Sequence, residues 1–95
     1  MIWVVGIETK AADQARRYDD ELSECLGRLG DHEPAGSVDL DGWMIQVSVT
    51  AAGSVEALTT ARGLIANAAD HVGLPYWSET RISIVNSVLW FQRRF

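Results

Sequence analysis

Residues 37–49 read SVDLDGWMIQVSV, and they contain the strongest local structural signal in the chain. Apolar and polar residues alternate on both sides of Asp41-Gly42, which is typical of two antiparallel strands joined by a tight turn. An Asp-Gly pair favours a two-residue turn of type I′, because both turn positions need a positive φ. In that register Leu40 pairs with Trp43 on one face of the sheet. The expected apolar face of the hairpin consists of Val38, Leu40, Trp43, Ile45, Val47 and Val49.

Amphipathic helical patterns lie on both sides of this hairpin, because apolar residues recur there three and four positions apart. The first predicted helix spans residues 11–29, with Thr9 as its expected N-cap. The second spans residues 55–72, with Ser54 as N-cap and Gly73 as its C-terminal stop. The apolar stripes are Ala15, Tyr18, Leu22, Cys25, Leu26 and Leu29 in the first helix, and Leu58, Ala61, Leu64, Ile65, Ala68 and Val72 in the second.

Strand patterns stand near both ends of the chain. Residues 2–8 read IWVVGIE and are apolar on both alternating sets, which is typical of a strand in the middle of a sheet. Residues 80–90 form the last alternating segment. The resulting order is the ferredoxin-like βαββαβ plan of an α+β domain. We therefore expect one domain over residues 1–95, with a four-stranded antiparallel sheet and two helices on one face.

The composition restricts the classes of function. The chain has 95 residues and a formal net charge of −5, which argues against a nucleic-acid partner because such binders cluster Lys and Arg. No apolar run approaches the roughly 18 residues of a membrane span, and the apolar start of the chain is too short for a signal peptide. We therefore expect a cytoplasmic protein without a membrane partner. With one cysteine there is no intramolecular disulfide, so self-association is a natural way for so small a domain to bury more surface.

Few residues are candidates for catalysis or metal binding. Cys25 lies on the apolar stripe of the first helix, which favours a buried small side chain over a nucleophile. Asp31, His32 and Glu33 form a charged loop whose spacing matches no metal-ligand pattern, and the helix dipole explains His71 near a helix C-terminus. The sequence contains no phosphate-binding loop, nucleophile elbow or HExxH motif. We expect no catalytic residue, no metal and no cofactor.

Aromatic and apolar residues are the best candidates for contact with a partner. Trp3 lies on the first strand, and Met44 lies on the expected open face of the sheet, opposite the helices. Tyr76 and Trp77 stand in the loop before the last strand, where they either contact a partner or cover the end of the second helix. The C-terminal segment would dock on a partner, on a second subunit or on the chain's own sheet edge. The candidate interaction residues are Trp3, Met44, Tyr76, Trp77, Trp90, Phe91 and Phe95.

Part of the sequence is similar to a group of known proteins. Residues 61–77, ARGLIANAADHVGLPYW, followed by the strand at residues 81–85, resemble small uncharacterised proteins of actinobacteria and their phages. The resemblance covers the last third of the chain and implies no activity. Arginine exceeds lysine and alanine is abundant, and their GC-rich codons agree with such a source. A phage origin implies a small protein that binds and modulates a host protein.

We expect a non-enzymatic protein-interaction module that binds a protein partner or forms a homodimer. The alternative is a small enzyme or ligand-binding domain, because length and the opening strand–helix unit are similar to dimeric α+β-barrel monooxygenases. Those proteins pair two ferredoxin-like sheets around an apolar cavity, and a deep pocket lined by tryptophan would favour this class. A third interpretation is an RNA binder with aromatic residues on its central strands, which the acidic charge disfavours.

Overall fold

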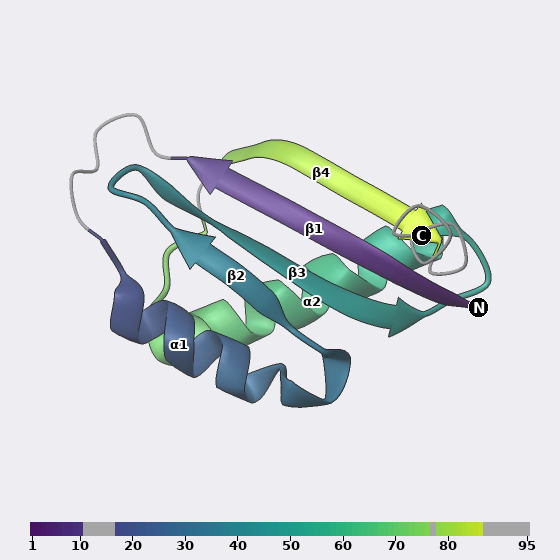
Figure 1. Ribbon diagram of the computed structural model, residues 1–95, viewed down its shortest axis with the longest axis horizontal. Coiled ribbons are helices and arrows are strands. Elements are labelled where there is room, and N and C mark those ends of the chain that lie inside the picture. The colour runs from purple at the N-terminus through teal and green to yellow at the C-terminus, as the bar shows by residue number, and fades with distance from the viewer. Residues whose placement is uncertain (11–16, 77, 87–95) are drawn as a thin grey trace, which may run out of the picture.

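The computed structural model describes residues 1–10, 17–76 and 78–86. Two strand–helix–strand units follow one another in this part of the chain, with a short 3-10 turn before the second strand (Figure 1). No helix in the described residues is long and apolar enough to cross a membrane. The elements are β1 (Ile2–Lys10), α1 (Asp19–Arg28), the turn η1 (Gly30–His32), β2 (Ala35–Val38), β3 (Gly42–Thr50), α2 (Ser54–Val72) and β4 (Ser78–Asn86).

The strands form a 4-stranded antiparallel sheet in the order β2-β3-β1-β4. β3 lies between β1 and β2, and β1 lies between β3 and β4, so each strand–helix–strand unit is split by a strand of the other unit. Both helices pack against the same side of the sheet and leave the opposite side without helical cover (Figure 1). The predicted α+β class, the antiparallel sheet and the central positions of β1 and β3 are confirmed.

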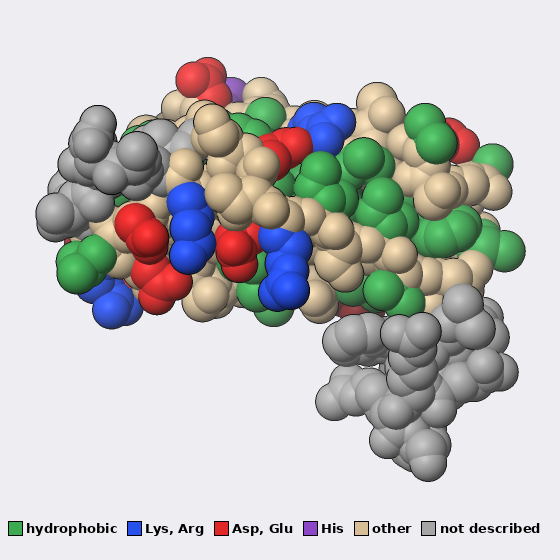
Figure 2. All heavy atoms as spheres, turned by 90° about the horizontal axis from the view of Figure 1, so that it is seen from above, with side chains coloured by type: hydrophobic (Ala, Val, Ile, Leu, Met, Phe, Trp, Pro, Cys, Tyr) green, Lys and Arg blue, Asp and Glu red, His purple; other side chains and the backbone are tan. Residues whose placement is uncertain are grey.

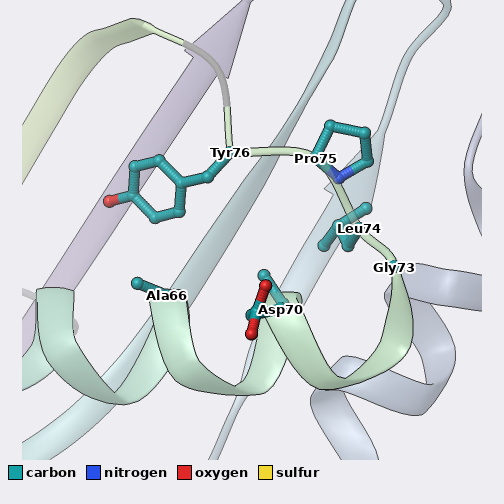
Figure 3. A pocket seen from close by; sticks show the side chains of 7 residues that line it. Ala66, Asp70, Gly73, Leu74, Pro75 and Tyr76 are labelled. Carbon is teal, nitrogen blue, oxygen red and sulfur yellow. The ribbon is translucent and has the colours of Figure 1, made fainter.

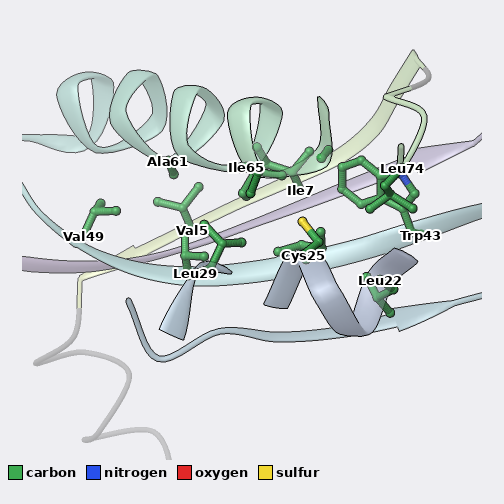
Figure 4. Packing of buried hydrophobic residues seen from close by; sticks show 14 of the residues in the cluster. Val5, Ile7, Leu22, Cys25, Leu29, Trp43, Val49, Ala61, Ile65 and Leu74 are labelled. Carbon is green, nitrogen blue, oxygen red and sulfur yellow. The ribbon is translucent and has the colours of Figure 1, made fainter. Parts of the chain in front are cut away.

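The apolar core lies between the sheet and the two helices (Figure 4). Alternate residues of β1 and β3 point into it, because side chains along a strand alternate between the two faces. Burying one such Val or Ile side chain stabilises the fold by about 1.5–3 kcal/mol. The core residues include Val5, Ile7, Trp43, Ile45, Val47 and Val49 from the strands, Leu22 and Cys25 from α1, and Ala57, Ala61, Ile65 and Ala68 from α2.

Helix α2 begins and ends close to the predicted positions, but its N-cap is Gly53 and not the predicted Ser54, which is the first residue of the helix. Its buried residues are mostly alanines, and their small side chains let the helix lie close to the sheet. The chain leaves the helix at Gly73, whose φ of 75° is in the left-handed region that glycine adopts without strain. The amide of Leu74 then donates to the carbonyl oxygen of Ala69 at 2.9 Å, which satisfies one of the free carbonyl groups at this end. The predicted stop at Gly73 is confirmed.

Helix α1 differs from the prediction at its N-terminal end. It begins at Asp19, while residues 11–16 lie outside the described part of the chain. Thr9 does not cap this helix, because β1 continues to Lys10 and Thr9 pairs with Trp43 and Glu79 of the neighbouring strands. The Thr9 side chain is fully buried among the core residues. Strand pairing over the whole length of β1 therefore overrides the local N-cap signal.

The β2–β3 hairpin forms, but the predicted register is wrong by two residues. Val38 lies opposite Trp43, and the tight turn is made by residues 40–41. The amide of Asp39 donates to the carbonyl oxygen of Gly42 at 2.8 Å, which closes this turn. Leu40 is therefore 59% exposed at the turn and does not pair with Trp43. A shift by two residues keeps every other apolar residue of the hairpin on its predicted face.

Gly42 has a different role from the one predicted. It is the first residue of β3 and lies opposite Lys10 of β1. A Cβ atom at Gly42 would collide with the carbonyl oxygen of Thr9. Positive φ angles occur at neither Asp41 nor Gly42, so no type I′ turn is present there. The close approach of β1, and not the geometry of the turn, explains the glycine.

The two outer edges of the sheet differ. β2 has 4 residues and pairs only with the first part of β3. Beyond it, the Nδ1–H group of His32 in η1 donates to the carbonyl oxygen of Ser48 at 3.2 Å and covers part of the exposed edge of β3. β4 has 9 residues and forms the other edge. Its predicted continuation to Trp90 lies outside the described residues.

Candidate protein-interaction surface

The side of the sheet that carries no helix is the candidate functional surface, and we call it the open face. Directly paired residues of neighbouring strands point to the same side, so the strand registers assign its members. Its residues alternate with those that fill the core. The open face includes Ile2, Val4, Gly6, Glu8 and Lys10 of β1, Ala35 and Ser37 of β2, Met44, Gln46, Ser48 and Thr50 of β3, and Arg81, Ser83 and Val85 of β4.

One end of the open face is apolar. Ile2 is 51% exposed there. Val4 and Val85 are direct cross-strand partners, and both are half-buried. Figure 2, which looks from the top of Figure 1, shows hydrophobic side chains gathered over this end of the molecule. Apolar side chains grouped on an uncovered sheet surface are typical of a contact site.

The middle of the open face carries small or uncharged side chains. Gly6 lies between Gln46 on β3 and Ser83 on β4. A Cβ atom at Gly6 would lie 3.7 Å from the Cβ atom of Ser83, which is an ordinary contact distance. The glycine is therefore not required by packing within the chain. Because Gly6 has no side chain, the backbone at the centre of the open face is accessible, and another molecule can approach it closely.

The other end of the open face carries charges of both signs. Glu8 and Arg81 are direct cross-strand partners, and the hydroxyl of Thr80 donates to the Glu8 carboxylate at 3.1 Å. Lys10 lies 3.8 Å from the carboxylate of Asp41, and both side chains are about half exposed. Figure 2 shows Lys, Arg, Asp and Glu side chains gathered over this end. The open face therefore changes from apolar at one end to charged at the other, and protein interfaces likewise combine apolar and polar parts.

Tyr76 is held by contacts within the protein. Its ring packs edge-on against Trp43, with 5.2 Å between the ring centroids. Its hydroxyl donates to the carboxylate of Glu79 at 2.5 Å, and Arg62 donates two hydrogen bonds of 2.9 and 2.8 Å to the same carboxylate. The hydrogen bonds from Arg62 hold the pKa of Glu79 below its ordinary value, and burial raises the pKa of Tyr76. These contacts fit the interpretation that Tyr76 covers the end of α2.

A depression of about 350 Å³ lies beside the C-terminal end of α2 (Figure 3). Asp70 and Tyr76 are its polar lining residues, and the rest are small or apolar. It lies on the helix side of the sheet, so it is not the cavity that two sheets would enclose by packing open face to open face. Its lining residues are Ala66, Ala69, Asp70, Gly73, Leu74, Pro75 and Tyr76.

The candidate interaction residues in the described part of the chain do not gather on one face of the sheet. Met44 lies half-buried on the open face, opposite Glu8 of β1. Trp3 lies on the other side of the sheet, packs against the core and donates its Nε1–H to the carbonyl oxygen of Ala51 at 3.2 Å. Trp77 lies outside the described residues, as do the three aromatic residues of the C-terminal segment: Trp90, Phe91 and Phe95.

The candidate catalytic and metal-binding residues are not brought together. Cys25 is fully buried, and burial raises the pKa of its thiol. His32 bonds to the β3 backbone, and His71 donates to the carbonyl oxygen of Asn67 at 3.1 Å. The described residues contain no group of three or more His, Cys, Asp or Glu side chains that could hold a metal ion.

Sequence reasoning missed several residues of the open face. The apolarity of residues 2–8 on both faces indicated that one set would be uncovered, but it did not show which. Ile2 and Val4 belong to that set because their neighbours Trp3 and Val5 face the helices. The pairing of Glu8 with Arg81 joins residues 73 positions apart, and no local pattern contains that information.

Comparison of the chain with family models, with curated proteins and with solved structures gave no match.

Proposed function

We propose that this protein is an interaction module that binds another protein through the open face. The observation that carries the proposal is an uncovered sheet face with an apolar end, an accessible centre and a charged end. The depression beside the C-terminal end of α2 gives the enzyme alternative little support. Its described lining residues bring no nucleophile and base together. The resemblance of the last third to proteins of actinobacteria and their phages supports a partner in an actinobacterial host.

The apolar end would supply most of the binding free energy. Ile2, Val4 and Val85 lie on adjacent ends of β1 and β4, so one partner surface can cover them together. Removing apolar surface from water contributes about 25 cal/mol per Å² before the costs of association are subtracted. Glu8 and Arg81 at the other end would then orient the partner, because charges at an interface rim mainly contribute specificity.

Met44→Asp is the variant that tests this proposal. Met44 lies on the open face, and a carboxylate there would have to be desolvated when a partner covers it. We expect a bound partner from an actinobacterial lysate to be lost or weakened by about tenfold or more. Val55→Asp is the matched control, because Val55 is 79% exposed in the first turn of α2, where an acidic residue is tolerated.

The measurement is affinity capture with wild-type and both variants, followed by titration of the captured protein. Equal capture by wild-type and Met44→Asp would exclude the open face as the binding surface. The aromatic residues Trp77, Trp90, Phe91 and Phe95 stay a prediction, and Trp90→Ala tests the C-terminal segment in the same assay. If the wild-type protein captured no protein but bound a small molecule, the result would favour the ligand-binding alternative.

A further inference from the structure

The outer edge of β4, which points away from β1, has the features of a strand-pairing site. The opposite edge of the sheet is short and partly covered, because β2 has 4 residues and His32 bonds to the backbone of β3. β4 has 9 residues, and no other described strand pairs with its outer side. Long edge strands are templates for pairing with another chain, and most proteins shorten, cover or charge them.

The two halves of β4 are protected differently. The pairing of β1 with β4 is irregular between Glu8 and Thr9, so β4 carries a bulge near Thr80. Arg81 follows directly, and a bulge and a charge both disfavour pairing at an edge. The residues after it, Ile82-Ser83-Ile84-Val85, contain no charge and no proline. This part of the β4 edge therefore lacks the bulge and the charge that disfavour pairing with another strand.

One side chain in this part of β4 is more exposed than its neighbours on β1. Ile82 and Ile84 lie opposite Ile7 and Val5, so they point to the helix side of the sheet. Ile82 is nevertheless 39% exposed, while Ile7 and Val5 are fully buried. The edge thus leaves an isoleucine partly in water on the side where the rest of the sheet is covered.

The sequence at this point is symmetric. Ile82-Ser83-Ile84 reads the same in both directions, and in a two-fold interface between identical chains residue i contacts j while j contacts i. Antiparallel pairing about Ser83 places Ile82 of each copy opposite Ile84 of the other, and the four isoleucines share one face. Arg81 is then opposite Val85, and the two Arg81 side chains stand roughly 14 Å apart along the strands, beyond the Debye length of about 8 Å.

We propose that β4 pairs with β4 of a second copy of this chain, antiparallel about a two-fold axis at Ser83. The two sheets join into one continuous sheet, and the open faces of both copies remain available on the same side. This inference does not depend on the open-face function, because the edge and the face are different surfaces.

Amide hydrogen exchange at low and high protein concentration tests the pairing directly. We expect the β4 amides that point away from β1 to become protected by about tenfold or more as concentration rises, since pairing gives them a new acceptor. Amides of β2 at the opposite edge should not change. Protection that is independent of concentration throughout β4 would overturn the proposal.

Ile82→Lys and Ser83→Cys test the register. A lysine at Ile82 should convert the sedimenting dimer to a monomer, while Val55→Lys on α2 should leave the dimer intact. Ser83→Cys should form a disulfide-linked dimer on oxidation, because directly opposed residues have Cα atoms about 4.5–5.5 Å apart, within disulfide range. Ser48→Cys on β3 is the matched control and should not cross-link.

The outcomes separate the two proposals. Equal cross-linking through Ser48→Cys and Ser83→Cys would show that the copies meet through their open faces, and it would overturn edge pairing. A dimer that survives Ile82→Lys would also overturn it. Met44→Asp should leave the dimer intact even where it abolishes partner capture, so either proposal can fail while the other stands.

Discussion

Thr9 places a polar hydroxyl group in the apolar core. Its Oγ1 atom is the buried side-chain polar atom in the described residues that has no hydrogen-bond partner. A buried hydroxyl without a partner lowers stability, because it loses its hydrogen bonds to water. Valine has the same branched shape and no hydroxyl group. The loss of stability at Thr9 therefore comes from the Oγ1 atom alone, because the shape of the side chain fits the core.

We expect Thr9→Val to raise the free energy of unfolding by about 1 kcal/mol. Urea denaturation of the wild-type and the variant measures the change. Thr50→Val, at the exposed end of β3, is the control and should change stability by less than about 0.5 kcal/mol. A destabilised Thr9→Val variant would show that the hydroxyl does have a partner.

Glu79 makes stability depend on pH, because its carboxylate is held by Arg62 and Tyr76. These hydrogen bonds lower the pKa of Glu79 in the folded state. A carboxyl group with a lowered folded pKa stabilises the protein above its unfolded pKa, and this stabilisation is lost as pH falls through the folded pKa. We expect Glu79→Gln to cost about 1 kcal/mol at neutral pH, discounted for the partial exposure of the pair.

Urea denaturation at neutral pH and in acid checks this expectation. The difference between wild-type and Glu79→Gln should shrink in acid, because both side chains are then uncharged. The double variant with Arg62→Gln should lose less stability than the sum of the single variants, since both substitutions remove one interaction. A difference that stays the same at both pH values would contradict this role for the ionised carboxylate.

Gly42 determines how the β2–β3 hairpin can pack against β1. In the observed register any Cβ atom at this position meets the β1 backbone at Thr9 and Lys10. In a type I′ turn asparagine would be tolerated, because it adopts positive φ more easily than alanine. We therefore expect Gly42→Ala and Gly42→Asn to destabilise alike, by about 2 kcal/mol or more, since neither neighbour can move away cheaply.

Thermal or urea denaturation of the two Gly42 variants measures this effect. Gly27→Ala is the matched control, because a Cβ at Gly27 in α1 meets nothing within 4 Å. Alanine there should raise the free energy of unfolding by about 0.5–1 kcal/mol through better helix propensity. If Gly42→Asn were much milder than Gly42→Ala, the predicted turn register would be the correct one.

The elements were predictable where the signal is local. The apolar stripe and terminal glycine of α2 gave its bounds, and the order of elements gave the sheet topology. The N-terminal part of β1 was predicted, but its extension to Lys10 depends on pairing with Gly42, which is distant in sequence. The same pairing explains the error in the hairpin register. A glycine at position 42 fits either a turn with positive φ or a close approach of β1, and a sequence pattern does not distinguish the two.

The candidate surface, which the strands of the sheet form together, was predictable from the sequence only in outline. Two helices on one side of a sheet imply an uncovered side, and Met44 was correctly placed there. Trp3 was not assigned to a side, because both alternating sets of residues 2–8 are apolar. The gradient from apolar to charged along the open face depends on the pairing of β1 with β4, which only the three-dimensional structure supplies.

We propose that the open face, and not the helices, contacts a partner protein. Cross-saturation NMR on the isotope-labelled chain, in complex with the unlabelled protein it captures, tests this most directly. We predict that saturating the partner reduces the amide signals of the open-face residues Val4, Gln46 and Ser83. Signal loss confined to α1 and α2, with β1, β3 and β4 unaffected, would show that the partner binds the helices instead.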